Sequence, residues 1–197
     1  PQSVTLAQTI NFGRGLTGVA VLAKQNNADL KVVDIGVNTD KEIPGVINRK
    51  IRKGTSNIVK GQAMSYSECI KAINTGIEMA KRSYEEKYSI LGVGEMGIGN
   101  TTTSSSVLVS LTDCTIEAAV GKGAGITNEA FAKKKWVVQE AIKVNKPDKN
   151  SPVDVLAKVG GFDLAGMVGV FLGAAYYKLP VVIDGFISAV AALVAVR

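Results

Sequence analysis

The segment from Gly94 to Ser106 contains the residues best suited to bind a ligand. A predicted strand ends at Gly94, two more glycines follow at Gly97 and Gly99, and a helix is expected to begin directly after them. Glycines let the backbone approach a ligand closely, and the amides at the start of a helix point outward as anion donors. Thr and Ser hydroxyls over 101–106 add further donors. The pattern predicts a loop that holds a phosphorylated small molecule, with a merely tight strand–helix turn as the alternative.

Glu95 narrows the kind of ligand that this loop would bind. The loop lacks the lysine of a P-loop, and its glycine spacing differs from the dinucleotide fingerprint. A carboxylate at its mouth is a poor neighbour for a phosphate group but a good acceptor for ribose hydroxyl groups. A nucleotide or sugar phosphate therefore fits better than free phosphate, and a helix-capping role for Glu95 is the alternative.

Three further segments could complete the site. The glycine-rich loop Gly121–Gly125 precedes a predicted helix that carries Lys133–Lys135, and one of these lysines could supply a positive charge for a phosphate. A lysine triplet on a helix is more often a solvated face, however. Asp163, in the segment Gly160–Gly166, could cap the following helix or complete the site, and the cap is favoured. Asp184 ends the last predicted strand, where a site residue or a helix cap fits equally well.

Composition limits the available chemistry. The 197 residues include no histidine, the commonest general base and metal ligand, so acid–base chemistry must use carboxylates, lysine or tyrosine. Cys69 and Cys114 lie far apart and outside any CxxC spacing, which favours reduced, buried thiols over a disulfide or a metal site. We therefore expect no metal and no cofactor. The net charge of +6 is compatible with an anionic ligand or a nucleic acid.

Strands and helices are predicted to alternate along the chain. Strands are expected over 30–37, 88–94 and 179–184, and helices over 5–24, 67–87, 102–111, 128–144, 164–177 and 186–197. Ser67 and either Thr127 or Asn128 are candidate caps, and Pro152 is expected in the first turn of a further helix. This order predicts an α/β fold: a three-layer, Rossmann-like arrangement of a mostly parallel sheet with helices on both faces. Ligands bind such sheets at the carboxyl ends of the strands.

The chain is expected to form a single large α/β domain over residues 1–197. Residues 38–60, which are polar and basic, are interpreted as a long surface excursion. The apolar run over 164–177 is shorter than the ~20 residues that a membrane helix requires. No signal peptide is visible, and we expect a cytoplasmic protein without a membrane partner.

Several segments together resemble the nicotinate-nucleotide–dimethylbenzimidazole phosphoribosyltransferase family. They occur in the family's order and extend over nearly the whole chain. The matching segments are Val33–Gly36, Gly94–Thr102, Gly121–Gly125, Gly160–Asp163 and Val182–Ile187. The resemblance implies transfer of phosphoribose from nicotinate mononucleotide to a nitrogen of 5,6-dimethylbenzimidazole or a related base. Nicotinate is released, and the product is the lower-ligand ribotide of cobalamin.

The resemblance also implies a set of substrate-binding residues. They are Gln8, Glu95, Met96, Gly97, Gly99, Asn100, Thr101, Gly123, Lys134 and Asp163. Within this set, Glu95 and Gly97 would hold the nucleotide near its ribose and phosphate. The amides and hydroxyls over 99–101, with Lys134, would bind the phosphate. Asp163 would lie nearby as a structural or ribose-side group, and Met96 and Gln8 would line the benzimidazole pocket.

This chain differs from the family's pattern at both ends. The family's catalytic glutamate would follow the position of Arg197, so no catalytic residue is expected within this chain. The family's small domain, built from segments before Pro1 and after Arg197, is expected to be absent. A homodimer is expected from the family.

Two other functions remain open at this stage. One is a truncated, non-catalytic relative that still binds the nucleotide. The other is a basic nucleic-acid-binding module that would use Arg49–Lys53 and Lys133–Lys135. Low aromatic content without basic–aromatic interleaving disfavours the second, and we expect no nucleic-acid partner.

Overall fold

The computed structural model describes residues 2–123 and 125–197. The chain divides into two compact units. The first comprises the residues up to Gly54 together with Met96–Ile98, and the second comprises Thr55–Glu95 and Gly99–Arg197. Whether these units belong to one large domain, as the sequence predicts, stays a prediction. Each unit is described by itself below.

The first unit contains two helices and a short parallel strand pair. Its elements are α1 (Gln2–Gly13), α2 (Gly18–Gln25), β1 (Val33–Asp34) and β2 (Ile47–Asn48). The single helix predicted over 5–24 is wrong, because the chain turns at Gly15 with a left-handed φ of +71°. A new helix then begins at Gly18, and the hydroxyl of its N-cap Thr17 accepts a hydrogen bond from the Ala20 amide.

Much of the basic run over 49–53 takes part in local contacts within the first unit. Asp34, which is only 4% exposed, accepts hydrogen bonds from the Gly36 and Val37 amides and lies 3.1 Å from Lys50 Nζ. Lys53 Nζ pairs with Asp40 at 2.6 Å. Lys50 and Lys53 therefore form ion pairs within the first unit. Their charges are partly neutralised, which disfavours a nucleic-acid-binding surface here.

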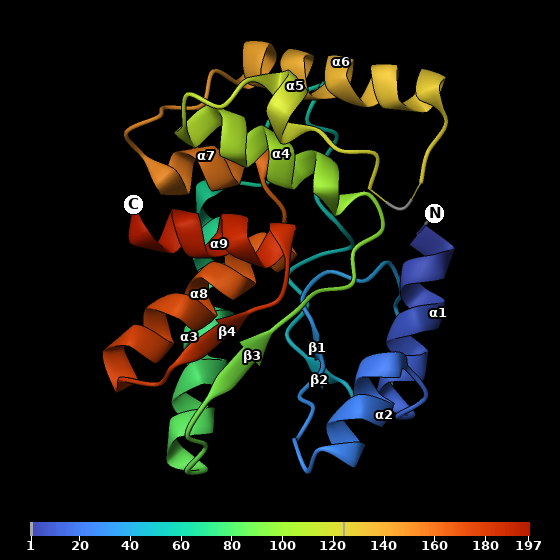
Figure 1. Ribbon diagram of the computed structural model, residues 1–197, viewed down its shortest axis with the longest axis vertical. Coiled ribbons are helices and arrows are strands. Elements are labelled where there is room, and N and C mark those ends of the chain that lie inside the picture. Colours follow the sequence, from blue (N-terminus) through green and yellow to red (C-terminus); the bar gives the residue numbers. More distant parts are fainter. Residues whose placement is uncertain (1, 124) are drawn as a thin grey trace. The chain divides into compact units, whose positions relative to one another are not determined.

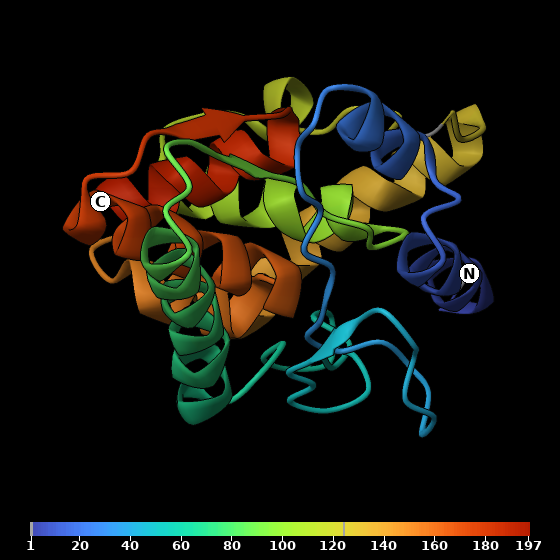
Figure 2. The same cartoon turned by 90° about the horizontal axis from the view of Figure 1, so that it is seen from below.

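The second unit is rich in helices and holds the other parallel strand pair (Figures 1 and 2). Its elements are α3 (Tyr66–Glu85), β3 (Leu91–Val93), α4 (Asn100–Leu111), α5 (Ile116–Ala119), α6 (Asn128–Asn145), α7 (Pro152–Val159), α8 (Phe162–Tyr177), β4 (Val181–Ile183) and α9 (Phe186–Val196). Strands β3 and β4 run parallel, with Leu91 opposite Val181 and Val93 opposite Ile183. The predicted α/β class and parallel pairing are confirmed, although each described sheet has only two strands.

Backbone contact between α3 and α8 forms the centre of the second unit. A side chain at Gly76 would overlap the carbonyl oxygen of Gly166, and one at Gly169 would overlap the carbonyl oxygen of Ile73. Helix α8 also packs against α9, and α9 packs against α4. Small residues on two facing helices therefore determine where α8, and every residue it carries, can lie.

The helix starts show which predicted caps are correct. Helix α3 begins at Tyr66 and is capped by Ser65, not by Ser67: the Ser65 hydroxyl accepts from the Glu68 amide, and the Glu68 carboxylate accepts from the Ser65 amide. Thr127 caps α6, as predicted, and Pro152 lies in the first turn of α7, also as predicted. Among the helices of the described residues, none is long and apolar enough to cross a membrane.

The two cysteines are free thiols, as predicted, but only Cys69 is buried; Cys114 is half-buried, so its predicted burial is wrong. Cys69 is buried in the second unit, and burial raises its pKa to about 12. A thiol with such a pKa carries almost no thiolate at neutral pH. Cys69 is therefore a small packing residue and not a nucleophile.

The substitution Gly169→Ala should destabilise the second unit. The added methyl group would overlap the Ile73 carbonyl, and overpacking of a helix contact costs about 1–3 kcal/mol. Urea unfolding followed by circular dichroism measures the loss. Gly92→Ala is the matched control, because its methyl group would enter open space. Equal free energies of unfolding for the two variants would contradict the close α3–α8 contact.

Candidate functional site

The paired strands of the second unit end at one edge, and a pocket lies there. Because Val93 and Ile183 are register partners in a parallel pair, the turns that follow them leave the sheet side by side. The pocket has a volume of about 210 Å³. Its lining residues are Gly94, Glu95 and Thr101 from the turn after β3 and the start of α4, and Asp184, Gly185, Phe186, Ile187 and Ser188 from the turn after β4 and the start of α9. Phe186, Ile187 and Ser188 are not among the predicted site residues, although Phe186 and Ile187 lie in a segment that carries the family resemblance.

A side-chain amide joins two carboxylates beside this pocket. Asn100 Nδ2, at the first residue of α4, donates to Asp163 Oδ2 at 2.6 Å and also to Glu95 Oε2. Asp163 lies in the first turn of α8, and Glu95 follows β3. The favoured role of Asp163 as a helix cap is therefore wrong. Gly161 is the N-cap of α8, and Asp163 instead completes a cluster with Asn100 and Glu95.

This cluster keeps two carboxylates close to one another through a shared side-chain amide. An amide nitrogen has two N–H donors, and here each carboxylate takes one of them. Each carboxylate retains further acceptor positions. The arrangement is suited to accepting hydrogen bonds from neighbouring hydroxyl groups of a ligand, such as those of a sugar.

Helix α4 begins without a side-chain cap. Its N-cap is Gly99, which has a left-handed φ of +98° and no side chain to accept from the first-turn amides. Helices α2, α3 and α6 instead have Thr17, Ser65 and Thr127 as their N-caps, and the hydroxyls of these residues accept such bonds. The uncapped amides and partial positive charge at the start of α4 are suited to an anion.

Lys134 brings a positive charge to the same helix start. Its Nζ donates to Thr101 Oγ1 at 2.8 Å and to the Gly121 carbonyl oxygen at 2.9 Å, and the residue is only 9% exposed. Burial lowers the Lys134 pKa, because it disfavours the charged amine. The interpretation of the lysine triplet as a solvated face is therefore wrong for Lys134. It remains apt for Lys133, which is exposed.

Gly123 lies against this lysine and threonine, with a left-handed φ of +60°. A side chain there would lie 3.2 Å from Thr101 Oγ1 and 3.7 Å from Lys134 Nζ. Glycine therefore lets the loop approach both groups. Ala124, in the middle of the same predicted loop, lies outside the described residues.

The structure does not bring every predicted site residue together within one unit. Gln8, Met96 and Gly97 belong to the first unit, where the Ile98 amide donates to Thr5 Oγ1 at 3.3 Å. Their roles in substrate binding stay predictions. Among the described residues, no group of three His, Cys, Asp or Glu side chains could hold a metal ion.

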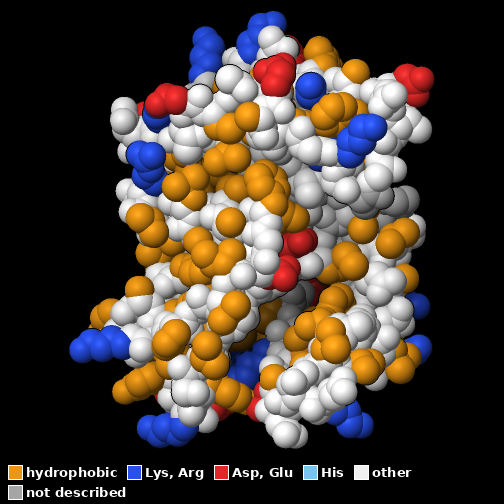
Figure 3. Space-filling model, in the orientation of Figure 1, with side chains coloured by type: hydrophobic (Ala, Val, Ile, Leu, Met, Phe, Trp, Pro, Cys, Tyr) orange, Lys and Arg blue, Asp and Glu red, His pale blue; other side chains and the backbone are white. Residues whose placement is uncertain are grey.

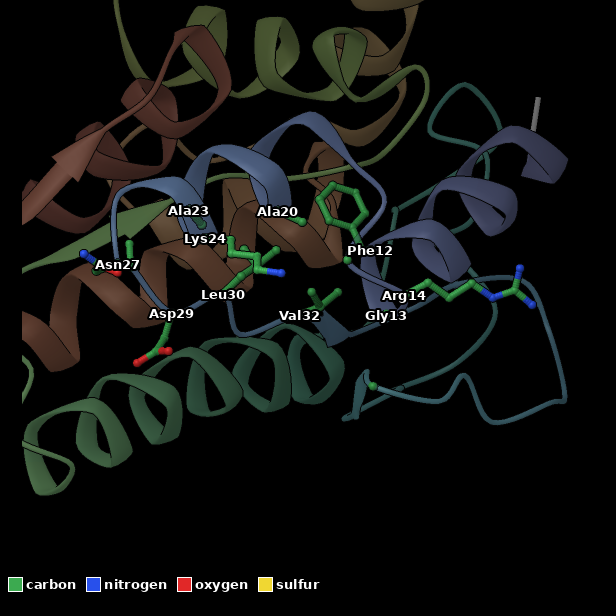
Figure 4. A pocket seen from close by; sticks show the side chains of 13 residues that line it. Phe12, Gly13, Arg14, Ala20, Ala23, Lys24, Asn27, Asp29, Leu30 and Val32 are labelled. Carbon is green, nitrogen blue, oxygen red and sulfur yellow. The ribbon is translucent and has the colours of Figure 1, made fainter.

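A larger pocket, of about 650 Å³, lies within the first unit and was not anticipated by the sequence analysis. It is bounded by the end of α1, by α2 and by the segment around Leu30 and Val32 (Figure 4). Figure 4 shows Lys24 near Leu30, whereas Arg14 and Asp29 extend away from them. The charged groups do not converge on one point, so this pocket offers less specific chemistry than the acidic cluster.

Comparison with known proteins gives one consistent result. Residues 1–197 match the family model described as Phosphoribosyltransferase (DBI_PRT). The chain is 57% identical over its 197 residues to nicotinate-nucleotide–dimethylbenzimidazole phosphoribosyltransferase of Clostridium perfringens, of which it covers 55%. It is 53% identical to the enzyme of that name from Clostridium acetobutylicum, of which it covers 56%. The chain thus spans a little over half the length of these relatives.

A solved structure agrees with these sequence comparisons. The crystal structure of CobT from Thermus thermophilus superimposes with a TM-score of 0.92 at 34% sequence identity. The match covers 99% of this chain and 59% of that chain. The fold and the sequence therefore indicate the same relationship.

The substitution Asn100→Asp should make the stability of the chain strongly pH-dependent. It replaces the bridging amide with a third carboxyl group, whose pKa the two neighbouring carboxylates raise in the folded state. A carboxyl group whose pKa is raised on folding contributes stability below its unfolded pKa of about 4 and loses it as the pH rises. The free energy of unfolding should therefore fall below that of the original chain at pH 7, and the difference should shrink towards pH 4.

Urea unfolding at several pH values measures this difference. Asn57→Asp is the control, because Asn57 is exposed and its Oδ1 accepts from the Val59 amide, which an aspartate can also do. A deficit for Asn100→Asp that did not change with pH would contradict the bridged cluster.

Proposed function

The chain belongs to the nicotinate-nucleotide–dimethylbenzimidazole phosphoribosyltransferase family, and from this membership we propose that it binds nicotinate mononucleotide for phosphoribosyl transfer to 5,6-dimethylbenzimidazole or a related base. The names of the relatives support this choice of substrates. Because the chain spans little more than half the length of those relatives, the proposal assigns it the nucleotide-binding part of the reaction. From the resemblance we propose that the general base is a glutamate outside residues 1–197.

The observation that carries the proposal is the arrangement of charge around the start of α4. Lys134 and the uncapped start of α4 provide positive charge for a phosphate. Both lie at Thr101, which is in the first turn of α4 and accepts a hydrogen bond from Lys134 Nζ. Glu95 and Asp163, bridged by Asn100, provide acceptors for hydroxyl groups. A sugar phosphate needs both kinds of group close together, and a phosphoribosyl group has this pairing.

The chemistry of the transfer explains why carboxylates would suit the sugar side. The bond from ribose C1′ to the nicotinate ring nitrogen breaks, a bond from C1′ to a benzimidazole nitrogen forms, and the benzimidazole loses the proton of its other nitrogen. Positive charge develops on the ribose ring as nicotinate leaves. Fixed negative groups stabilise such a charge more in the transition state than in the bound substrate. Glu95 and Asp163 would contribute in this way while holding the ribose in place.

The base-binding part of the proposal rests on the resemblance alone. We assign Gln8 and Met96 to the pocket for the benzimidazole, and Gly97 to close backbone approach to the nucleotide. Assembly as a homodimer and a cytoplasmic location belong to the same proposal. A nucleic-acid partner is not proposed, because Lys50 and Lys53 are occupied by Asp34 and Asp40.

A binding-only relative, which keeps the nucleotide site without transferring phosphoribose, is the second candidate. Incubation of the chain with nicotinate mononucleotide and dimethylbenzimidazole separates the two functions. Release of nicotinate with formation of the α-ribotide supports transfer. Nucleotide binding without release supports the binding-only function, and the absence of any nucleotide binding would contradict both.

The substitution Lys134→Met should weaken binding of nicotinate mononucleotide by roughly 10- to 100-fold. Two of the three Nζ donors are used by Thr101 and Gly121, which leaves one for a phosphate oxygen, and a hydrogen bond to a charged group contributes about 1.5–3 kcal/mol. Isothermal titration calorimetry measures the affinity. Lys133→Met is the matched control, because Lys133 is an exposed lysine on the same helix. An equal loss in both variants would show that general charge, and not this contact, attracts the nucleotide.

A further inference from the structure

We infer that Asp184 is a further substrate-binding residue, whose carboxylate accepts hydrogen bonds from the ribose hydroxyl groups of the bound nucleotide. The inference rests on the proposed function, because it needs a phosphoribosyl group in the pocket at the ends of β3 and β4. It extends the sugar-binding part of the site from the turn after β3 to the turn after β4.

The backbone at Asp184 is held by a buried serine. The amides of Asp184 and Gly185 both donate to Ser188 Oγ, at 3.0 and 2.9 Å. The Ser188 hydroxyl donates in turn to the Gly185 carbonyl oxygen at 3.0 Å, and Ser188 is only 3% exposed. This hydroxyl thereby performs the capping role that the sequence would allow Asp184 to take. The turn is fixed without using the Asp184 carboxylate.

The Asp184 carboxylate has no hydrogen-bonding or ionic partner among residues 2–123 and 125–197. Two other carboxylates in the second unit have partners: Asp154 lies 2.9 Å from Lys158 Nζ, and Asp163 accepts from Asn100. A carboxylate with a fixed backbone, no protein partner and a position on the wall of a pocket is suited to a ligand.

The shape and lining of the pocket favour a sugar. Its volume of about 210 Å³ is below the roughly 300–1,000 Å³ of sites for drug-sized ligands, so it suits a pentose better than a whole nucleotide. Glu95 and Thr101 line it on the α4 side, and Asp184 lines it on the α9 side with the apolar Phe186 and Ile187. Thr101 accepts a hydrogen bond from Lys134, so the positive charge suited to a phosphate lies on the Thr101 side of the pocket. Glu95 and the exposed Asp184 belong to the same lining.

The outer surface near this turn is apolar. Val182, Ile183 and Phe186 are 54%, 48% and 42% exposed. Figure 3 shows hydrophobic side chains gathered over the region of α8, α9 and β4. Within this apolar surrounding, the Asp184 carboxylate on the pocket wall is a distinct polar group.

The test compares the original chain with Asp184→Ala in calorimetric titrations with nicotinate mononucleotide and its 2′,3′-dideoxy analogue. We expect Asp184→Ala to weaken binding of the nucleotide about 10-fold and to leave binding of the dideoxy analogue unchanged. Asp184→Asn, which retains one acceptor oxygen, should lose less affinity for the nucleotide than Asp184→Ala does. Glu117→Gln, at an exposed carboxylate on α5, is the control and should bind both ligands as the original chain does.

The outcomes separate this inference from the proposed function. If the original chain binds nicotinate mononucleotide and Asp184→Ala binds it equally well, Asp184 does not contact the ribose, whereas the proposed function stands. If Asp184→Ala weakens binding of the nucleotide and of the dideoxy analogue by the same factor, the carboxylate does not bind the ribose hydroxyl groups. Its effect then comes from the conformation of the turn, and the inference fails. If the original chain binds neither ligand, both the inference and the proposed function fail. Unchanged melting temperatures show that the variants are folded.

Discussion

The hydrogen bonds from the Asn100 side chain to Glu95 and Asp163 are the interaction on which the candidate site depends. They connect the turn after β3, the first residue of α4 and the first turn of α8. Without the amide, two half-buried carboxylates would lose the two N–H donors that lie between them and would repel each other more strongly. With it, they remain together at the edge where the paired strands end. The sugar side of the proposed site is therefore built by a neutral residue that holds two negative ones.

This interaction in turn depends on the packing of α8. Asp163 can meet Asn100 only if the start of α8 lies beside the start of α4. The position of α8 depends on the close backbone contacts that Gly76 of α3 and Gly169 of α8 allow between these two helices. Lys134 completes the other side of the site from α6, and Gly123 lets its loop come close. Helix packing thus brings together residues that lie far apart in the sequence, and the short strands contribute a common edge.

Much of the site could be predicted from local sequence, and the errors have physical causes. The glycine-rich segment from Gly94 to Thr101 could be identified because several glycines between a strand and a helix favour close approach of the backbone to a ligand. Lys134 could not be separated from its neighbours by pattern alone, because inward direction depends on how α6 packs. Local sequence favours a capping role for Asp163, whereas the structure pairs it with Asn100, which lies 63 residues away and is not a local signal. The size of the sheets was also not predictable, since β-branched residues favour extended backbone whether or not a partner strand is present.

The most direct measurement for the central claim is a crystal structure of the chain in complex with nicotinate mononucleotide. The account predicts the phosphate at the start of α4, within hydrogen-bonding distance of Lys134 Nζ. It predicts ribose hydroxyl groups donating to Glu95 or Asp163 while Asn100 still bridges these two carboxylates. A nucleotide bound with its phosphate against the carboxylates, or bound outside the pocket at the ends of β3 and β4, would contradict the account.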